Sequence, residues 1–381
     1  MIMVISEAAW FCLAVTAALG SIVFCKHKSP GQLGRPVVWL TGLCGGAYLL
    51  ILSFFWSLVL FSLLCFLMCM YLADQELLPV DQKAVLVTGC DSGFGHALAK
   101  NLDKLGFTVF AGVLNEKSSG AEELRRNCSK HITVLQMDIT NPEQIKDAHS
   151  KVIEKVQDKG LWALVNNAGI LGFPTDGELI PMIEYKKCME VNFFGPVEVT
   201  KAFLPLLRKS KGRLVNVSSM GGVVPLPKFA AYNSTKAALT MFSSIMRQEL
   251  SAWGVKVSVV QPGGFRTNIA GTNDVWLKNE KDILDHLTQE QLRDYGRDYV
   301  LLQKNFLNKF ESFTCPDFTP VLRDIQHAIS AQSPSPFYMP GKMVSLWVYF
   351  AFLSPTHLFD YCVKKIFVKS EYIPRALHMP N

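Results

Sequence analysis

Short apolar runs alternate with longer amphipathic stretches along the chain between residues 84 and 260. Apolar runs of strand length bounded by turn residues indicate buried strands, and stretches with apolar residues three or four positions apart indicate helices. Their alternation predicts an α/β fold that is doubly wound, with a largely parallel sheet covered on both faces. The predicted strands are 84–87, 107–113, 132–137, 161–165, 213–217 and 255–260, and the predicted helices include 94–105, 141–158, 182–208 and 230–253.

The N-terminal part of the chain has a different pattern. Residues 8–25 are apolar, and residues 37–73 contain no charged side chain. Because about 20 apolar residues suffice for a helix to cross a bilayer, we expect an N-terminal transmembrane anchor. The number of crossings and the side of the membrane that the remaining chain occupies stay open. We therefore divide the chain into an anchor and hinge (1–80), a catalytic core (81–270) and a C-terminal part (271–381).

The C-terminal part loses the simple alternation. Residues 270–340 read as an irregular helical insertion, of the kind that builds a substrate pocket at the carboxyl ends of the strands. Residues 343–368 are too apolar for a solvated tail. A second membrane contact, a lid over an apolar pocket and an ordinary core helix all fit this segment.

Composition and charge narrow the possible functions. The chain has 381 residues, of which 49% are hydrophobic and 18% charged, and this excludes a disordered protein. The net charge of +6 is spread without long basic runs, so we expect no nucleic-acid partner. Ten cysteines are present, but none is closely paired with histidine in the spacing of a zinc site, so we expect free thiols and no metal.

A glycine-rich turn follows the first predicted strand. Gly89, Gly93 and Gly95 open the next helix, where glycine lets backbone amides approach a pyrophosphate and the helix dipole favours its charge. This placement predicts a dinucleotide site of the Rossmann type. Asp138 ends the third strand, where its carboxylate suits either an adenine amino group or the cap of the following helix.

A tyrosine and a lysine lie four residues apart at Tyr232 and Lys236, on one face of a predicted helix. There the ammonium is expected to lower the pKa of the phenol toward working pH. Tyr361 and Lys365 have the same spacing. Only Tyr232 is preceded, thirteen residues earlier, by a serine at a strand end, Ser219, which can donate to the same substrate oxygen. This context identifies Tyr232 as the candidate acid/base.

From residue 82 to residue 270 the chain resembles the short-chain dehydrogenase/reductases, and within them the membrane-bound steroid and retinol dehydrogenase branch. Six motifs in family order over about half of the chain carry the resemblance. They are Thr88-Gly89-x3-Gly93-x-Gly95, Asn166-Asn167-Ala168-Gly169, Val191-Asn192-Phe193-Phe194-Gly195, Ser219, Tyr232-x3-Lys236 and Pro262-Gly263-x-Phe265-x-Thr267.

The resemblance implies roles for these residues. Tyr232 would be the general acid/base and Ser219 would orient the substrate oxygen. Lys236 would hold the nicotinamide ribose, and Asn192 would hold a water in a proton relay. For Asn166 and Asn167, backbone bonding at the strand end is the alternative. The implied cofactor-binding residues are Gly89, Ser92, Gly93, Phe94, Gly95, Asp138, Asn167, Gly169, Tyr232, Lys236 and Thr267, and Ser219 and Tyr232 would also bind the substrate.

The choice between NAD and NADP depends on the end of the second strand. Relatives that use NAD often place a carboxylate there, but residues 110–114 contain none. These residues include no lysine or arginine either, and position 92 is a serine rather than a cationic residue. A bare 2′-phosphate needs a cationic partner more than a hydroxyl needs a carboxylate, so we expect NAD. Glu116 is the nearest carboxylate, either assisting or solvated.

The resemblance also implies an activity. It implies a membrane-bound, homodimeric enzyme of the endoplasmic reticulum. This enzyme would use NAD to oxidise the 17β-hydroxyl of estradiol and testosterone to the ketone, and it would also oxidise 20α-hydroxyprogestins. The family dimerises through helices that include 182–208 and 230–253. A retinol or other lipid-alcohol dehydrogenase is the alternative with the same chemistry. A catalytically silent nucleotide-binding membrane scaffold would belong to a different class.

Overall fold

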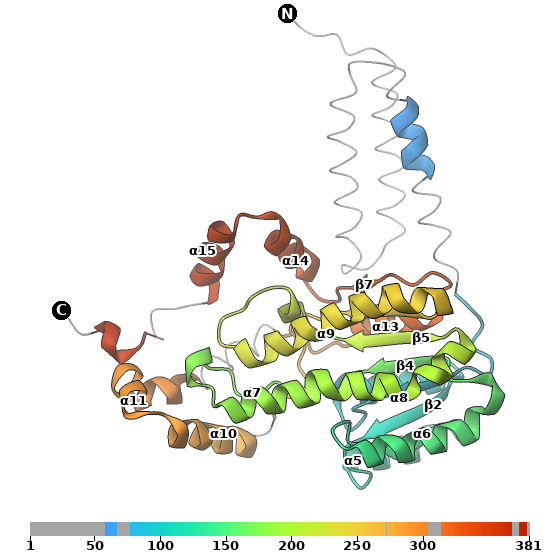
Figure 1. Ribbon diagram of the computed structural model, residues 1–381, viewed down its shortest axis with the longest axis horizontal. Coiled ribbons are helices and arrows are strands. Elements are labelled where there is room, and N and C mark those ends of the chain that lie inside the picture. The colour runs from blue at the N-terminus through green and yellow to red at the C-terminus, as the bar shows by residue number, and fades with distance from the viewer. Residues whose placement is uncertain (1–57, 67–76, 272, 304–313, 368–372, 379–381) are drawn as a thin grey trace, which may run out of the picture. The chain divides into compact units, whose positions relative to one another are not determined.

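A computed structural model describes residues 58–66, 77–271, 273–303, 314–367 and 373–378 (Figure 1). The chain divides into two compact units, one formed by Met1–Leu78 with Ala331–Ser333 and the other by Pro79–Ser330 with Pro334–Asn381. In the first unit, residues 58–66 are helical and Leu77 forms an antiparallel bridge with Ala331. Most of the expected anchor lies outside the described residues. Within the described part, none of the helices combines the length and apolarity needed to span a bilayer.

The second unit is built on a seven-stranded parallel sheet. Its order is β3-β2-β1-β4-β5-β6-β7, and every pair of neighbours is parallel. The six predicted strands are confirmed within two residues at each end, and a seventh, two-residue strand joins the edge. The bounds are β1 Ala84–Val87, β2 Thr108–Val113, β3 Ile132–Gln136, β4 Ala163–Asn166, β5 Arg213–Val217, β6 Lys256–Val260 and β7 Phe337–Tyr338.

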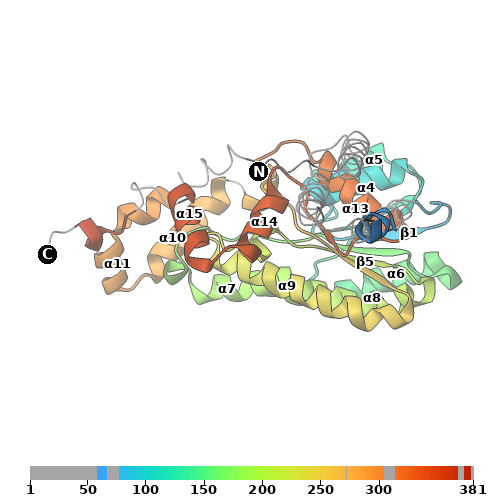
Figure 2. The same ribbon diagram turned by 90° about the horizontal axis from the view of Figure 1, so that it is seen from above.

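Helices cover both faces of this sheet. In Figure 2, α4, α5 and α13 lie on one side of the strands, and α6, α8 and α9 lie on the other. The helices that flank or follow the sheet are α4 Gly93–Lys104, α5 Ser119–Asn127, α6 Pro142–Val156, α7 Met182–Met189, α8 Gly195–Ser210, α9 Ala230–Glu249, α10 Asn273–His286, α11 Gln289–Tyr295, α13 Thr319–Ser330, α14 Val344–Leu353 and α15 Thr356–Phe367.

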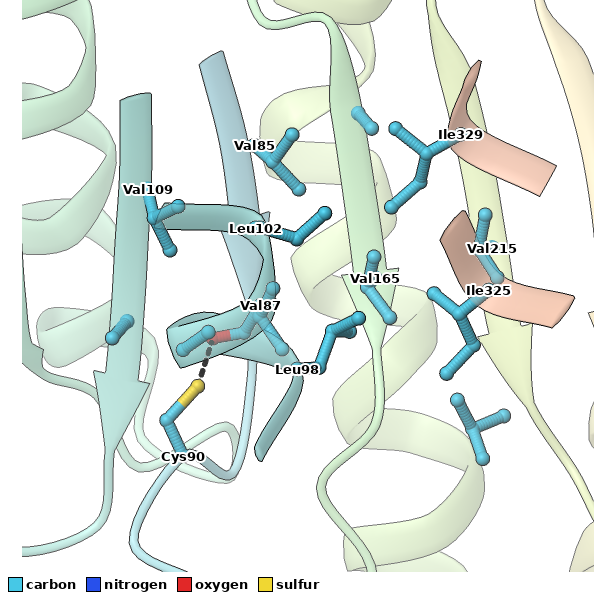
Figure 3. Close-up of a cluster of buried hydrophobic side chains, with 14 of the residues drawn as sticks. Val85, Val87, Cys90, Leu98, Leu102, Val109, Val165, Val215, Ile325 and Ile329 are labelled. Carbon is cyan, nitrogen blue, oxygen red and sulfur yellow. Dashed lines mark hydrogen bonds between the residues drawn. The ribbon is translucent and has the colours of Figure 1, made fainter. Parts of the chain in front are cut away.

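Alternate residues of each strand enter two separate cores. Val85 and Val87 of β1 pack with α4, α5 and α13, whereas Leu86 packs with α6 and α8. This explains the continuous apolar runs, because a strand buried on both faces has no polar side. Figure 3 shows the first core, in which fully buried side chains of α4 and α13 point toward those of the sheet: Leu98, Leu102, Ile325 and Ile329 toward Val85, Val87, Val165 and Val215.

The long predicted helix 182–208 is interrupted. It consists of α7 and α8, joined by a π-helical segment Glu190–Phe194. An extra residue per turn leaves no signature in the apolar pattern, so the sequence could not indicate it. The predicted helix 230–253 is α9 followed by a 3-10 turn, Leu250–Trp253.

The strand order determines where a ligand-binding crevice lies at the edge of the sheet. The chain runs outward from β1 through β2 to β3 and then returns to β4 on the other side of β1. Loops at the carboxyl ends of β1 and β4 therefore diverge, and open α/β sheets bind ligands at this switch point. Residues 273–303, here called the cap, contain α10, α11 and a further helical turn, as predicted for the insertion. The prediction is wrong for residues 319–338, because α13 packs in the first core and β7 pairs with β6. Residues 344–367 form α14 and α15.

Candidate active site

The loop between β1 and α4 is an open turn that presents backbone amides to the crevice. Gly89 and Gly93 have φ angles of +70° and +59°, which glycine adopts without strain. A Cβ atom on Gly95 would lie 2.2 Å from the carbonyl oxygen of Gly89. The Ser92 side chain makes no capping hydrogen bond, so the first-turn amides of α4 are left for a bound anion. The turn thus fits the pyrophosphate of a dinucleotide.

A cavity of about 420 Å³ lies along this turn and the ends of β3 and β4. Its size and its glycine-lined wall suit an extended nucleotide. Gly95 lies behind the turn rather than at the surface of the cavity. Of the residues predicted to bind the cofactor, those lining the cavity are Gly89, Ser92, Gly93, Phe94, Asp138, Asn167, Gly169 and Thr267.

The asparagine pair after β4 has two different tasks. The Asn167 amide donates to the carbonyl oxygens of Thr88 (2.9 Å) and Gly89 (3.2 Å), and so holds the glycine turn while it also lines the cavity. Asn166 is buried in the interior, where its amide donates to Asn216 (2.8 Å) and Thr200 (2.9 Å). Backbone bonding at the strand end is therefore confirmed for Asn167, whereas Asn166 bonds mainly to side chains.

Asp138 lies at the end of β3 and faces the crevice. Its carboxylate accepts hydrogen bonds from the backbone N–H (2.9 Å) and hydroxyl (2.8 Å) of Thr140. The cap of α6 is instead Asn141, which accepts from Glu143 and Gln144. Of the two alternatives for Asp138, the helix cap is thus wrong, and the adenine contact stays a prediction.

A carboxylate does stand at the end of β2, although the strand itself carries none. Asp91, in the glycine-rich turn, accepts from the backbone N–H groups of Leu114 (2.8 Å) and Asn115 (3.2 Å), and it lines the cavity. Glu116 is exposed, as the solvated alternative predicted. Sequence reasoning missed Asp91 because its position in the turn does not reveal that its side chain folds across to the next strand.

The three catalytic candidates meet around a second, smaller cavity of about 140 Å³. Ser219 follows β5, and Tyr232 and Lys236 lie one turn apart on α9. Ser219 hydrogen-bonds to Tyr232, and the Lys236 Nζ lies 5.7 Å from the centre of the tyrosine ring. Lys236 donates to the carbonyl oxygen of Val217 (3.0 Å). The serine, tyrosine and lysine that the sequence pointed to are therefore neighbours.

Burial dominates the titration of this group. It raises the pKa of Tyr232 to about 12, against a lowering contribution from the Ser219 hydrogen bond, and the nearby Cys188 adds to the rise. Burial also lowers the pKa of Lys236 to about 8. The expectation that Lys236 brings the tyrosine pKa below its ordinary value is wrong for the protein by itself, because burial raises that pKa by more than the Ser219 hydrogen bond lowers it.

Asn192 lies in the π-helical segment and is fully buried. Its side chain accepts from the N–H of Ile170 (2.8 Å) and donates to the carbonyl of Ile170 (2.8 Å) and to the hydroxyl of Thr235 (3.1 Å). It thereby fixes the loop after β4 to α9, beside Lys236. Its part in a water relay stays a prediction.

The two cavities share walls, and their outer linings differ. Both are lined by Phe94, Asn167, Gly169, Thr267 and Ile269. The remainder of the smaller cavity is largely apolar, with Leu171, Met220, Leu226, Phe229 and Phe265. Tyr361 of α15 is 62% exposed and lines neither cavity, so its spacing to Lys365 has no counterpart of the catalytic arrangement. The arrangement joins a nucleotide crevice to an apolar pocket at Tyr232.

No metal centre accompanies these groups in the described ranges. There, no cluster of three or more histidine, cysteine or acidic side chains could hold a metal ion. The described cysteines are free thiols, as expected from their scattered positions, and Cys90 and Cys188 are buried.

Comparison with known proteins gives consistent matches. The short chain dehydrogenase family matches residues 83–278. Human 17-beta-hydroxysteroid dehydrogenase type 2 is 64% identical, covering 99% of this chain and 97% of its own. Mouse estradiol 17-beta-dehydrogenase 2 is also 64% identical, over 98% of both chains. Human 11-beta-hydroxysteroid dehydrogenase type 2 is 43% identical, over 79% of this chain and 74% of its own. A crystal structure of a short-chain dehydrogenase from Streptomyces avermitilis, 26% identical, superposes with a TM-score of 0.56 over 74% of this chain and 94% of its own.

Proposed function

Because the chain belongs to the short-chain dehydrogenase family, we propose that it oxidises the 17β-hydroxyl of steroids such as estradiol and testosterone to the ketone, with a nicotinamide dinucleotide as the oxidant. The observation that carries the proposal is the meeting of Ser219, Tyr232 and Lys236 in an apolar cavity that opens onto the glycine-lined crevice. The names of the relatives that match almost the whole chain supply the substrate class.

The chemistry divides between cofactor and protein. When bound, the nicotinamide cofactor would supply the acceptor for a hydride from the carbinol carbon. Tyr232, as phenolate, takes the hydroxyl proton, and Ser219 donates a hydrogen bond to the same oxygen. Because burial raises the tyrosine pKa to about 12, the phenolate is scarce at neutral pH. The rate of oxidation should therefore increase with pH.

Lys236 affects this proton transfer in two ways. Its pKa of about 8 lets it exchange a proton near working pH, and its ammonium form stabilises the phenolate by charge. We place the cofactor ribose beside it, because Lys236 lines the smaller cavity and Gly169 lines both cavities. A Cβ atom on Gly169 would lie 3.1 Å from the Asn192 Oδ1 and 3.4 Å from the Lys236 Nζ, so a side chain there would crowd this place.

The experiment is oxidation of estradiol and of retinol by membranes containing the full chain. Tyr232→Phe should abolish ketone formation from estradiol. Tyr361→Phe is the matched control, because Tyr361 has the same spacing to a lysine but lies outside the cavities, and it should retain full activity. Oxidation of retinol alone would move the substrate to another lipid alcohol. Inactivity on both would favour the scaffold, and full activity of Tyr232→Phe would refute the mechanism.

For the cofactor we propose NAD rather than NADP. The support is Asp91, whose carboxylate stands at the end of β2 and would repel a 2′-phosphate while accepting a bond from a ribose hydroxyl. Arg125 reaches the same loop, but it donates to the carbonyl of Glu116 and does not line the cavity.

Asp91→Asn keeps an acceptor oxygen for Leu114 and removes the charge. It should reduce the preference for NAD, measured as the ratio of the two kcat/KM values, by about tenfold, since about 1.4 kcal/mol of repulsion disappears. Glu116→Gln, in the exposed part of the loop, is the matched control and should leave the ratio unchanged. A wild-type preference for NADP would contradict the proposal.

We also propose that the protein is anchored in the endoplasmic reticulum membrane. Two observations support contact with lipid: the uncharged N-terminal segment 37–73, and α14, in which Leu346, Phe352 and Leu353 are 58%, 70% and 81% exposed. The full chain should stay in the membrane pellet after alkaline carbonate extraction and should colocalise with a marker of that compartment. Release into the supernatant would contradict the anchor.

A homodimer through α7, α8 and α9 is the proposed assembly. Apolar side chains on these helices and on the π-helical segment between α7 and α8 are between 47% and 66% exposed, which is unfavourable for a free surface: Met182, Ile183, Phe194, Met241 and Ile245. Crosslinking of detergent-extracted protein should give a dimer that Met241→Glu weakens. A monomer only, in the wild type, would count against it.

A further inference from the structure

A partly buried ionic cluster, in which the Asp176 side chain is 33% exposed, lies apart from the catalytic groups. The ammonium of Lys228 donates to Asp176 (2.8 Å) and to the hydroxyl of Tyr299 (2.8 Å), and that hydroxyl donates to Asp176. The Lys228 side chain is only 8% exposed and also lies over the Tyr299 ring. The three residues are widely separated in the chain, so only the folded structure joins them.

Each member of the cluster belongs to a different part of the substrate region. Asp176 precedes the short helix Gly177–Leu179, in the loop that follows the NNAG motif. Lys228 immediately precedes Phe229, the N-cap residue of the helix α9 that carries Tyr232. Tyr299 is in the cap. The cluster therefore ties the cap to the segment that leads into the catalytic helix.

The apolar contacts around the cluster extend to the smaller cavity, which Ser219, Tyr232 and Lys236 line and which is here called the substrate cavity. Phe229, Leu171 and Leu226 line that cavity, and the same three side chains pack with Trp276, Ile283 and Tyr299 of the cap in one hydrophobic cluster. Movement of the cap would remove the support behind this wall of the cavity. Its position therefore bears on how a bulky apolar ligand fits.

A second polar contact between cap and loop is less buried. Tyr295 donates to the carboxylate of Glu178 (2.8 Å), and the Gln291 amide donates to the Glu178 carbonyl (3.2 Å). Solvent-exposed pairs contribute little, whereas breaking a buried pair leaves an uncompensated charge. Lys228 and its partners are thus the contact on which the cap depends.

The backbone conformation of Lys228 supports the same conclusion. Its φ angle is +74°, in the region that residues other than glycine rarely adopt. Such a conformation persists only where surrounding contacts stabilise it. The bonds from the Lys228 side chain to Asp176 and Tyr299 supply those contacts.

We propose that Asp176, Lys228 and Tyr299 are positioning residues that hold the cap against the wall of the substrate cavity and so set the affinity for the steroid, without taking part in the chemical step. The inference rests on the proposed function for the identity of the substrate. The bonds among the three side chains are observed independently of that function.

The kinetic test uses Asp176→Asn, Tyr299→Phe and the double variant Asp176→Asn/Lys228→Met. Asp176→Asn should raise the KM for estradiol about tenfold, as expected when a buried charge loses its partner, with kcat and the KM for the dinucleotide within about twofold. Tyr299→Phe removes only a hydroxyl and should raise the steroid KM less. The double variant should lie closer to wild type than Asp176→Asn, because it no longer buries an unpaired ammonium.

The matched control is Asp158→Asn, which breaks the exposed pair of Asp158 with Lys209 (2.9 Å) on the surface. It should leave every constant unchanged. A parallel loss of kcat, dinucleotide affinity and steroid affinity in Asp176→Asn would mean general damage to the fold and overturn the proposal. Wild-type steroid KM in both single variants would overturn it as well.

Amide hydrogen exchange without steroid separates this inference from the proposed function. Peptides from residues 273–303 should exchange faster in Asp176→Asn and Tyr299→Phe than in wild type or Asp158→Asn, whereas peptides from β1 and β5 should not change. Faster exchange in a protein that does not oxidise estradiol would keep the positioning role and remove the substrate. Unchanged exchange of the cap would remove the positioning role even if estradiol is oxidised.

Discussion

Replacing the buried catalytic lysine should make the protein more stable as it becomes inactive. Lys236 is 3% exposed, and burial lowers its pKa from 10.5 to about 8. At about 1.4 kcal/mol for each tenfold change in an acid constant, keeping it protonated in the folded state costs about 3 kcal/mol at pH 7. Lys236→Met removes this cost. It also loses the hydrogen bond to Val217, worth about 1 kcal/mol, so the net gain should be about 2 kcal/mol.

The lowered pKa of Lys236 also predicts how the stability difference between variant and wild type changes with pH. Between pH 8 and 10.5, unfolded Lys236 holds a proton that the folded side chain has released, so the free energy of unfolding of the wild type rises with pH across this window. About 1 kcal/mol of that rise should appear between pH 7 and pH 9. Lys236→Met should lack this contribution. The difference in stability between variant and wild type should therefore shrink as the pH increases.

The assay is thermal unfolding of the detergent-extracted full chain at pH 7 and pH 9, at one scan rate, followed by tryptophan fluorescence. A gain of about 2 kcal/mol should raise the Tm of Lys236→Met by about 4 °C at pH 7, with no steroid oxidation. Lys209→Met, which removes a largely exposed lysine, is the control and should change the Tm little. The reasoning is refuted if Lys236→Met unfolds at a lower temperature, or if its difference from wild type is the same at both pH values.

Three further predictions test the crevice and the core. Gly95→Ala should abolish dinucleotide binding, followed by the fluorescence of the reduced cofactor, because its new Cβ would lie 2.2 Å from the Gly89 carbonyl; tight binding would show that the turn yields. Leu98→Ala should lower the free energy of unfolding by about 2–5 kcal/mol in denaturant titrations, because the side chain is fully buried (Figure 3); a loss below about 1 kcal/mol would mean that the site collapses. Burial raises the pKa of Cys90, so iodoacetamide should label Cys362 well before it in the native protein, as read by mass spectrometry; equal labelling would contradict the buried thiol.

The central strands were predictable because β1, β4 and β5 are buried along their whole length, on both faces of the sheet. Four consecutive apolar residues, as in 84–87, suit a strand inside such a sheet, and β1 has the predicted bounds. β5 also has the predicted bounds, although Arg213 and Asn216 interrupt its apolar pattern. β7 is the exception. It has two residues, Phe337 and Tyr338, between Pro336 and Pro340, and two residues cannot show a period. It joins the sheet through bonds to β6, which local sequence does not encode.

The candidate site was predictable as far as its motifs are local. The glycine turn and the Tyr232–Lys236 spacing each lie within one loop or one helix, so their geometry follows from the chain around them. The reach of Asp91 across to Leu114 depends on the tertiary structure and could not be read. The direction of the tyrosine pKa shift was mispredicted for a related reason: a spacing of four residues reveals a nearby lysine but not the burial that raises the pKa of the phenol.

The two buried lysines of this fold show how burial and pairing separate function from positioning. Lys228 is compensated by the carboxylate of Asp176 and the hydroxyl of Tyr299, so its charge stabilises one arrangement of the cap. Lys236 has a carbonyl oxygen as its bonded partner, and within the described residues no carboxylate pairs with it. A protonated amine in that position is destabilised until a negative charge forms beside it. The phenolate of Tyr232 is such a charge, so the cost of burying Lys236 is recovered when the tyrosine gives up its proton. A carboxylate placed next to Lys236 would stabilise the resting protein and weaken that coupling, which is a physical reason for leaving this lysine without one.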